Sequence, residues 1–258
     1  MRAMLAAIRC GKGDVDGNLA THLRLVRSAG CDLVLFPEMS LTGSVDPASR
    51  PDRLVGLDHP AIATLAEATG GTGVAVCFGV AERSPGGDPY ITQVVAAGGR
   101  VVGVQRKRHL GPGEEPFSAA SASRTFAHAG VRFGIAICAE GGHDGPFDAA
   151  HAGGAGLVLF PAAPGLYGRR TDEGSWRAGH SWWEGCALGD ARRHARRLGL
   201  WVALAGQAGS TEDEDFPGLA ALVTPDGEVA ERLPDWREGV LTVEIPPVVS
   251  HAAGTVAG

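Results

Sequence analysis

The stretch that decides the fold occurs twice, as GCDLVLFPEMSLTG at residues 30–43 and as GAGLVLFPAAPGLYG at residues 154–168. Shifting the first copy by 124 residues (157 minus 33) aligns Leu33 with Leu157 and brings the two Phe-Pro pairs into register. Each copy contains a short run of branched apolar residues, which is typical of a buried strand. The repeat indicates two similar halves. Only the first copy carries a carboxylate, Glu38, directly after the Phe-Pro pair, so the halves are expected to differ in chemistry.

The rest of the chain alternates short strands with helical segments. Apolar positions at helical spacing predict helices at residues 18–29, 60–69 and 183–198, with Asp16 or Asn18 capping the first. Two halves, each of strand, helix, strand and hairpin, most economically stack as two mixed β-sheets face to face with helices outside, which is an α/β fold. Apolar runs predict strands at residues 4–8, 32–36, 73–82, 91–97, 100–107, 132–138, 156–160, 201–208, 220–224 and 240–245.

Composition narrows the class of protein. The 258 residues are 44% hydrophobic and 20% charged, which fits one globular domain, predicted over residues 1–246, with a loosely held tail at 247–258. A formal charge of −6 without a basic stripe argues against nucleic acid as a partner. No apolar run reaches the roughly 20 residues of a membrane span, and the first residues lack the shape of a signal peptide. We therefore expect no membrane partner and a cytoplasmic location.

The cysteines and acidic clusters indicate neither disulfides nor a metal site. Five cysteines lie far apart without a CxxC pair, so free thiols are expected. His180 and Glu184 share a possible helical face, but without further ligands a solvated pair is favoured. The run EDED at 212–215 and the segment near Asp14 have too few ligands for calcium. The cysteines are Cys10, Cys31, Cys77, Cys138 and Cys186.

Three polar residues lie at the carboxyl ends of three predicted strands: Glu38, Lys107 and Cys138. Functional sites collect at the carboxyl ends of strands in α/β sheets. Taken singly, each residue has a structural explanation, namely a solvated carboxylate, a basic strand edge and a small buried thiol. Together they form a complete set, because a carboxylate can deprotonate the thiol and an ammonium can stabilise the negative charge that grows as the thiolate attacks a carbonyl or nitrile carbon.

At these residues the sequence resembles the nitrilase superfamily of carbon–nitrogen hydrolases. LVLFPEMSLTG is similar to the family's glutamate motif, RKRHLGPGEEPF to its lysine motif and GIAICAE to its cysteine motif, in the family's order. WVALAGQAG at 201–209 is similar to the strand and turn that follow the long helix of the second half. The resemblance implies a four-layer αββα sandwich with pseudo-twofold internal symmetry. It also implies that Glu38 is the general base, Lys107 the oxyanion-stabilising cation and Cys138 the nucleophile.

Further site residues follow from the same resemblance. A second glutamate seven places after the lysine falls on Glu114, with Glu115 as the adjacent competitor and a solvated acidic pair as the structural alternative. The backbone N–H of Ala139 is expected to be a second oxyanion donor, and Glu140 and His143 are expected in the oxyanion or substrate-binding region. The sequence departs from the family pattern here, because Ala139 stands where an aromatic residue is frequent.

Two other patterns have competing interpretations. His143 could act as the base of a Cys-His dyad oriented by Asp144 or Asp148, although nothing in the sequence places its imidazole near the thiol. The stretch 165–185 holds three of the five tryptophans and is interpreted as a pocket-lining insertion, with core or interface packing as the equal alternative. Gly206 occupies the place of a frequent asparagine, which leaves the substrate undetermined.

The sequence thus predicts hydrolysis of a small amide through a Cys138 thioester, with release of ammonia or an amine and without cofactor or metal. Alternatives are a nitrile or N-carbamoyl amine hydrolase, an acyltransferase, and a binding protein that keeps the fold without activity. The resemblance also implies a homodimer or a larger homo-oligomer.

Overall fold

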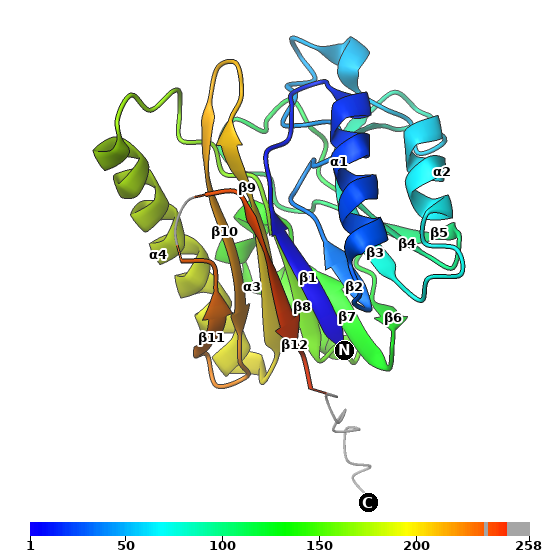
Figure 1. Cartoon of the computed structure of the whole chain (residues 1–258), viewed down its shortest axis with the longest axis vertical. Coiled ribbons are helices and arrows are strands. Elements are labelled where there is room, and N and C mark those ends of the chain that lie inside the picture. The colour runs from blue at the N-terminus through cyan, green and yellow to red at the C-terminus, as the bar shows by residue number, and fades with distance from the viewer. Residues whose placement is uncertain (235–236, 247–258) are drawn as a thin grey trace, which may run out of the picture.

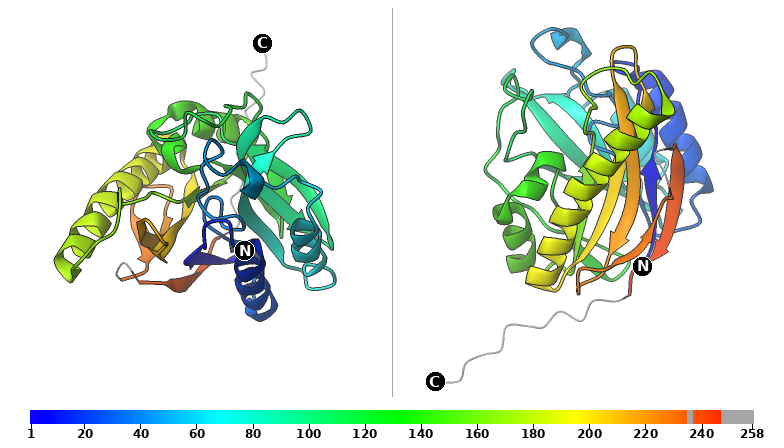
Figure 2. Two further views of the ribbon diagram at one scale, coloured as in Figure 1. Left: turned by 90° about the horizontal axis from the view of Figure 1, so that it is seen from above. Right: turned by 90° about the vertical axis from the view of Figure 1, so that its left-hand side faces the viewer.

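Two mixed β-sheets of six strands lie face to face in the middle of the molecule, and helices cover both outer faces (Figures 1 and 2). The computed structural model describes residues 1–234 and 237–246, and the predicted tail at 247–258 lies outside the described residues. The first sheet has the strand order β12 (Gly239–Glu244), β1 (Arg2–Ala7), β2 (Leu33–Leu35), β3 (Ala75–Arg83), β4 (Pro89–Ala97), β5 (Arg100–Arg106). The second has the order β11 (Val229–Arg232), β10 (Asp215–Val223), β9 (Trp201–Ser210), β8 (Leu157–Ala162), β7 (Val131–Ile135), β6 (Phe126–His128).

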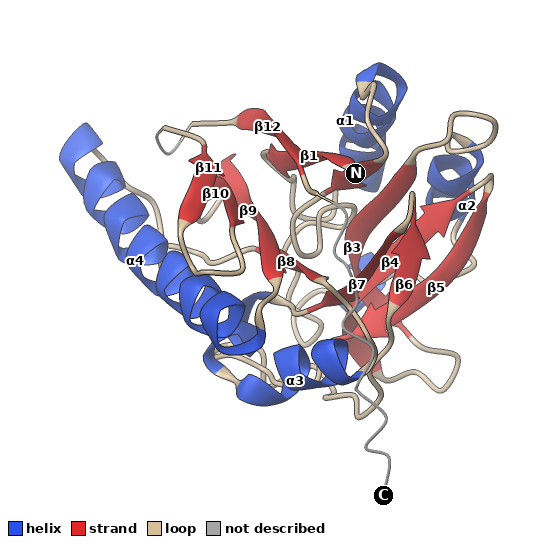
Figure 3. Cartoon of the chain, turned by 90° about the horizontal axis from the view of Figure 1, so that it is seen from below, coloured by secondary structure: helices blue, strands red, loops and turns tan. Residues whose placement is uncertain are grey.

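The helices form the outer layers. In Figure 3, α1 and α2 lie outside the first sheet, and α3 and α4 lie outside the second. This arrangement confirms the predicted α/β sandwich of two mixed sheets with helices outside. The α-helices are α1 (Val15–Ser28), α2 (Pro60–Glu67), α3 (Asp144–Ala152) and α4 (Glu173–Leu198), and the 3-10 helices are η1 (Pro51–Arg53) and η2 (Cys138–Gly142).

The repeat seen in the sequence is a repeat of topology. Strands β1, β2 and β3 are parallel neighbours and β4 is antiparallel to β3, while β7, β8, β9 and β10 repeat the same relations in the second sheet. Leu33 is in register with Ala75, and Leu157 with Trp201, at corresponding positions. Helices α1 and α3 then connect corresponding strands. The two copies of the LVLF run are therefore the second strands of two equivalent halves.

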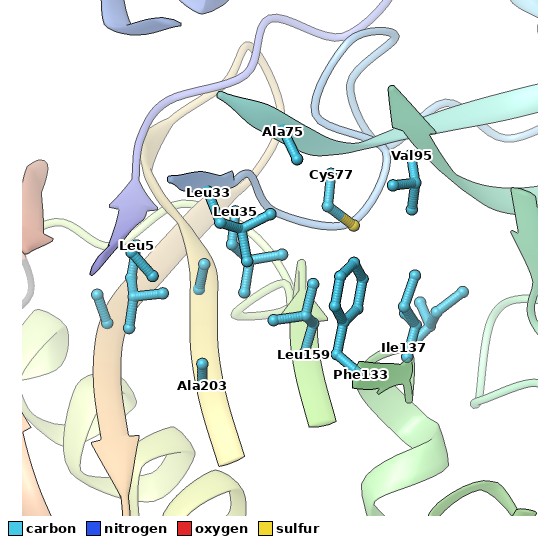
Figure 4. Close-up of a cluster of buried hydrophobic side chains, with 14 of the residues drawn as sticks. Leu5, Leu33, Leu35, Ala75, Cys77, Val95, Phe133, Ile137, Leu159 and Ala203 are labelled. Carbon is cyan, nitrogen blue, oxygen red and sulfur yellow. The ribbon is translucent and has the colours of Figure 1, made fainter. Parts of the chain in front are cut away.

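The main core lies between the sheets, as Figure 4 shows. Successive side chains of a strand point to opposite faces, so Leu33 and Leu35 enter this core while Val34 packs toward the helices. Phe133 and Leu159 of the second sheet meet them from the other side, and all of these side chains are fully buried. Each such side chain contributes about 1.5–3 kcal/mol on burial, which makes the contact between the sheets a principal source of stability.

The start of α1 differs from the prediction. The cap is Asp14, whose carboxylate accepts a hydrogen bond of 3.1 Å from the backbone N–H of Gly17, so the expectation of Asp16 or Asn18 is wrong. Asn18 lies inside the helix, where its amide instead donates to the carbonyls of Gly11 and Leu41. Several Asp and Asn residues in this segment can each cap a helix, and tertiary contacts decide among them.

Helix α4 begins ten residues before the predicted start at Trp183, at Glu173. Asp172 and Ser175 form a capping box, and the helix ends at Gly199, which adopts a left-handed conformation with φ of 66°. Four glycines inside the helix weaken the apolar periodicity on which the prediction depended. Within residues 1–234 and 237–246, no helix combines the length and the apolar character that crossing a membrane requires.

Candidate active site

Glu38, Lys107 and Glu114 form one hydrogen-bonded cluster next to Cys138. The Nζ atom of Lys107 donates to Oε1 of Glu38 at 2.7 Å and to Oε1 of Glu114 at 2.6 Å. The Cys138 thiol is near enough to the Glu38 carboxylate to lower its pKa, against the effect of burial. Lys107 and Glu38 are 0% and 1% exposed, respectively, so both charges are removed from water. Glu38 thus meets a lysine and a cysteine that lie 69 and 100 residues further along the chain.

The segment that carries Glu38 is packed directly on strand β3. Gly79 permits this approach, because a Cβ atom there would come within 2.8 Å of the Glu38 carbonyl carbon and closer still to the Met39 nitrogen. Met39 has a left-handed φ of 47°, which turns the chain sharply after Glu38. Gln93 donates to the carbonyl of Pro37 at 3.3 Å. The position of the carboxylate is therefore fixed by the backbone on both sides.

A buried histidine supports the same turn. Nδ1 of His22 donates to the carbonyl of Asn18 at 2.7 Å, so its Nε2 is left to accept from the hydroxyl of Ser40 at 2.9 Å. The Ser40 oxygen in turn accepts from the backbone N–H of Gly79 at 3.1 Å. Burial lowers the pKa of His22 to about 4 despite the hydrogen bond to Asn18. The imidazole is neutral at pH 7, in the tautomer that this chain of bonds requires.

Cys138 occupies a strained turn that follows β7. Its φ is 46°, in the left-handed region that residues other than glycine rarely adopt, and η2 begins at this residue. The side chain is half-buried. The backbone N–H of Ala163, just after β8, donates to Oε2 of Glu38 at 3.0 Å and also lowers the pKa of the Cys138 thiol, against the effect of burial. The sulfur is thus held at a sharp bend beside the carboxylate.

The electrostatics favour a neutral thiol beside a charged lysine. Burial and the Glu38 charge raise the pKa of Cys138 well above its ordinary value, against the lowering effect of Lys107 and the Ala163 N–H. Burial also raises the pKa of Glu38, although the Lys107 charge opposes it. Burial by itself would lower the pKa of Lys107, but the negative groups around it raise that pKa overall. The raised pKa of Glu38 makes its carboxylate a stronger base toward the neighbouring thiol, whereas the raised pKa of Cys138 keeps the proton on sulfur in the resting site.

The structure distinguishes Glu114 from Glu115. One oxygen of Glu114 receives Lys107 and the other accepts from the Gly111 N–H at 2.6 Å, which locks the carboxylate in place. Glu115 is exposed and accepts from the backbone N–H of Gly113 at 3.2 Å. Glu114 is thus the one of the two that joins the cluster.

The remaining predicted residues lie on or beside η2. Ala139 is half-buried, and its methyl group lies 2.9 Å from where a Cβ of Gly111 would be, so the loop carrying Glu114 approaches it closely. Glu140 is fully buried, with both carboxylate oxygens bonded within the protein, which differs from the expected contact with a substrate. His143 is exposed and stacks on His109 with ring centroids 4.2 Å apart and planes 10° apart.

Histidine 194 of α4 holds the far end of the same turn. Its Nε2 lies 2.9 Å from the Gly141 carbonyl, and its ring stacks on Phe147 of α3 at 3.7 Å. Burial lowers the pKa of His194, against the effect of the Gly141 carbonyl, and the charges of Arg193 and Arg197 lower it further. The turn that bears Cys138 is thereby attached to both helices of the second half.

The acidic and tryptophan-rich stretches have structural partners. Glu184 forms an ion pair with Arg232, and the buried Asp215 pairs with Arg169. Over the part of the chain that the structure describes, no group of three or more His, Cys, Asp or Glu residues is placed to hold a metal. Trp183 is buried in the core beneath α4, which favours packing for this tryptophan, whereas Trp182 is 47% exposed.

Sequence reasoning missed three contributors, Gly79, His22 and Ala163. The internal repeat contained a signal for the last, because a shift of 124 residues places Ala162 at the position of Glu38. The loop after the second Phe-Pro pair is thus the counterpart of the Glu38 loop in the repeat. Gly79 and His22 had no such signal, since their roles depend on contacts between strand β3, helix α1 and the Glu38 segment.

Comparisons with known proteins agree with this architecture. A family profile described as carbon-nitrogen hydrolase matches residues 4–253. The chain is 26% identical over 85% of its length to a glutamine-dependent NAD(+) synthetase of Rhodobacter capsulatus, and 31% identical over 54% of its length to an (R)-stereoselective amidase of Pseudomonas sp.. The matches cover 38% and 51% of those relatives, so the matched stretches span about a third to a half of their lengths.

Among solved structures, an amidase from Nesterenkonia sp. aligns with a TM-score of 0.78 at 24% identity, over 96% of this chain and 90% of that one. The glutamine-dependent NAD+ synthetase of Acinetobacter baumannii aligns with a TM-score of 0.76 at 22% identity, over 93% and 44%. These likenesses show the same fold. The chain belongs to the carbon–nitrogen hydrolase family, which confirms the resemblance to the nitrilase superfamily and the prediction of a nitrilase-type enzyme.

Proposed function

We propose that this protein hydrolyses a small amide through a thioester on Cys138 and releases ammonia or an amine. The observation that carries the proposal is the buried contact of one lysine with two carboxylates beside a thiol at a strained turn. Family membership and the amidase relatives support the choice of an amide carbon as the electrophile. In one related structure, the amidase of Nesterenkonia sp. AN1 carries acrylamide added at its active-site cysteine.

In the proposed acylation, Glu38 takes the proton from the Cys138 thiol as the sulfur attacks the amide carbon. The carbonyl electron pair moves onto oxygen, where Lys107 Nζ and the backbone N–H of Ala139 stabilise the developing negative charge. Glu38 then returns the proton to the amide nitrogen, and the carbon–nitrogen bond breaks. Ammonia or an amine leaves, and the acyl group remains on sulfur.

In deacylation, water takes the place of the thiol as the nucleophile. Glu38 takes a proton from water, the hydroxide attacks the thioester carbon, and the same donors stabilise the second tetrahedral intermediate. The carbon–sulfur bond breaks, the acid leaves, and the sulfur regains its proton from Glu38. Glu114, bonded to Lys107 and to the Gly111 N–H, keeps the ammonium in place through both steps.

Ammonia release from a panel of primary amides, carbamoyl amines and nitriles tests the proposal. Replacing Cys138 by Ala is expected to abolish turnover, and intact-mass spectrometry of the wild type during turnover is expected to detect the acyl adduct. Turnover retained by the Cys138→Ala variant would refute the mechanism. Production of hydroxamate in the presence of hydroxylamine separates acyl transfer from hydrolysis. If no compound of the panel reacts, the alternative of a binding protein without activity is favoured.

A specific observation favours the side-chain amide of glutamine as the first compound to test. One curated relative, aligned over 85% of this chain, is a glutamine-dependent NAD(+) synthetase. Glutamine should then release ammonia faster than an unsubstituted aliphatic amide such as acetamide. The opposite order would favour the simple-amide interpretation, which the amidase relative supports.

We also propose a cytoplasmic location and a homo-oligomeric assembly for this protein. All five cysteines are free, as predicted, which fits a reducing compartment such as the cytoplasm. A homodimer or a larger assembly stays a prediction. Sedimentation of the purified protein tests the assembly, and cell fractionation tests the location.

A further inference from the structure

We propose that Glu140 is a positioning residue that fixes the distance between the lysine and the cysteine of the proposed site, rather than a substrate contact. The proposal rests on the proposed function for its catalytic meaning. Its basis is geometric, because one buried carboxylate bridges the chain segment next to Lys107 and the chain segment next to Cys138.

The two oxygens of Glu140 bind two different segments. Oε1 accepts from the backbone N–H of Arg108 at 2.8 Å and from its Nε at 3.2 Å. Oε2 accepts from the backbone N–H of Ile137 at 2.8 Å. The side chain is 0% exposed, and that of Arg108 is only 8% exposed. Water therefore does not compete for these bonds, which are charge-assisted and hence strong.

The backbone donors lie very close to the reacting groups in sequence. The Arg108 N–H belongs to the peptide unit that directly follows Lys107, and the Ile137 N–H lies one residue before Cys138. Peptide units are planar and rigid, so fixing one of them restricts the direction of the neighbouring side chain. A shift of either segment relative to the other would stretch a bond to the same carboxylate. Glu140 thus couples the strand end that carries the ammonium to the turn that carries the sulfur.

A carboxylate suits this bridge better than an amide. Both of its oxygens accept, whereas a glutamine would present one acceptor and one NH₂ donor. The NH₂ group would then oppose either the Ile137 N–H or the donors of Arg108. The variant Glu140→Gln therefore removes one side of the bridge while preserving size and burial.

Glu82 of strand β3 offers a matched control. This carboxylate is also 0% exposed, and it pairs with Arg106 at the end of β5, the residue on the other side of Lys107. The hydroxyl of Thr92 of β4 also donates to Glu82, at 2.6 Å, so these contacts join strands of one sheet and do not bind the cysteine turn. Glu82→Gln disturbs an equally buried carboxylate that also pairs with an arginine, without loosening the bridge.

The experiment measures alkylation of Cys138 by iodoacetamide in the full-length protein across pH, by peptide mass spectrometry. The exposed Cys186 is the reference thiol in each sample. Glu140→Gln is expected to slow the reaction of Cys138 at pH 7.5 by about tenfold, with the rate profile displaced to higher pH by about one unit, because weaker contact with Lys107 disfavours the thiolate. Glu82→Gln is expected to stay within about twofold.

The variant Glu140→Asp keeps both acceptors on a shorter side chain, so we expect it to fold and to show a partial loss. An unchanged Cys138 profile in folded Glu140→Gln, or in Glu140→Asp if the former does not fold, would overturn the proposal. Equal losses in Glu140→Gln and Glu82→Gln would overturn it as well. Alkylation displaces iodide and does not depend on amide hydrolysis, so a wild type that hydrolyses none of the panel would defeat the proposed function and leave this test intact.

Discussion

The variant Gly79→Ala tests whether the position of Glu38 is set by close packing on β3. A Cβ atom at residue 79 would lie 2.8 Å from the Glu38 carbonyl carbon and 2.9 Å from the Met39 Cα, and the Met39 nitrogen would be nearer still. These neighbours are backbone atoms, which cannot rotate away as a flexible side chain does. Gly79 is also held on both sides, because it pairs with Gln93 of β4 and its own N–H and carbonyl bond Ser40 and Leu41, so it cannot retreat either. We expect the Glu38 segment to move.

The size of the effect follows from these distances. Ordinary contact begins near 3.4 Å, so the Glu38 carbonyl carbon must move by about 0.6 Å and the Met39 nitrogen by more. A misplacement of about 1 Å can cost about a hundredfold in rate, so we expect kcat to fall by about 10-fold to 100-fold. That loss corresponds to about 1.4 to 2.7 kcal/mol of activation free energy. The overpacking itself should reduce the free energy of unfolding by about 1–3 kcal/mol.

Three measurements on the purified variant separate these effects: ammonia release, alkylation of Cys138 and thermal unfolding. Gly153→Ala is the control. Gly153 lies at the end of α3, and a Cβ atom there would lie 2.5 Å from the methyl carbon of Thr125, without touching the Glu38 segment. The control should lose stability and keep its rates within about threefold. A Gly79→Ala variant that is destabilised but retains wild-type rates would refute the reasoning.

Other predictions follow from the site. Glu114→Gln should lower kcat by at least about tenfold and Glu115→Gln by less than about twofold, because only Glu114 contacts the lysine; equal effects in steady-state kinetics would contradict this. His143→Ala should leave kcat within about threefold, since its ring stacks on His109, and a loss of several hundredfold would revive the Cys-His dyad. Burial raises the pKa of Cys77 above its ordinary 9.0, so unfolded chains release that proton first and stability falls as pH rises above 9.0. Between pH 8 and pH 10 the Cys77→Ala variant should therefore lose about 1.4 kcal/mol less stability than the wild type, as denaturant titrations at the two pH values would reveal.

The fold could be predicted from the sequence where apolar runs were long or repeated. The repeat at Leu33 and Leu157 specified two equivalent second strands, and their pairing partners confirm the relation. The short strands β6 and β11 and the helix α3 were missed, because three to nine residues carry little periodic signal. Helix α4 was shortened because its glycines interrupt the pattern. In such segments tertiary packing decides the structure.

The site divides along a similar line. Chemistry-bearing residues at strand ends were found from their type and position, and the structure places Glu38, Lys107 and Glu114 in direct contact. The residues that hold them could not be found in this way. A glycine such as Gly79 acts through the atoms that it lacks, and the role of Glu140 depends on which N–H groups its oxygens meet. Both are properties of the assembled backbone, for which one sequence contains no spacing rule.

The two halves contribute unequally to one site at their junction. The first half supplies the carboxylate and the ammonium, and the second supplies the sulfur. The second copy of the repeated motif has no side-chain carboxylate after its Phe-Pro pair, yet the backbone N–H of Ala163 contacts Oε2 of Glu38 and the thiol. A glutamate introduced at Ala162 would therefore not create a second site, because the lysine and the thiol would still lie beside Glu38 alone. The arrangement exists only while the two sheets are stacked, so the apolar core between them determines the geometry of the proposed chemistry as well as stability.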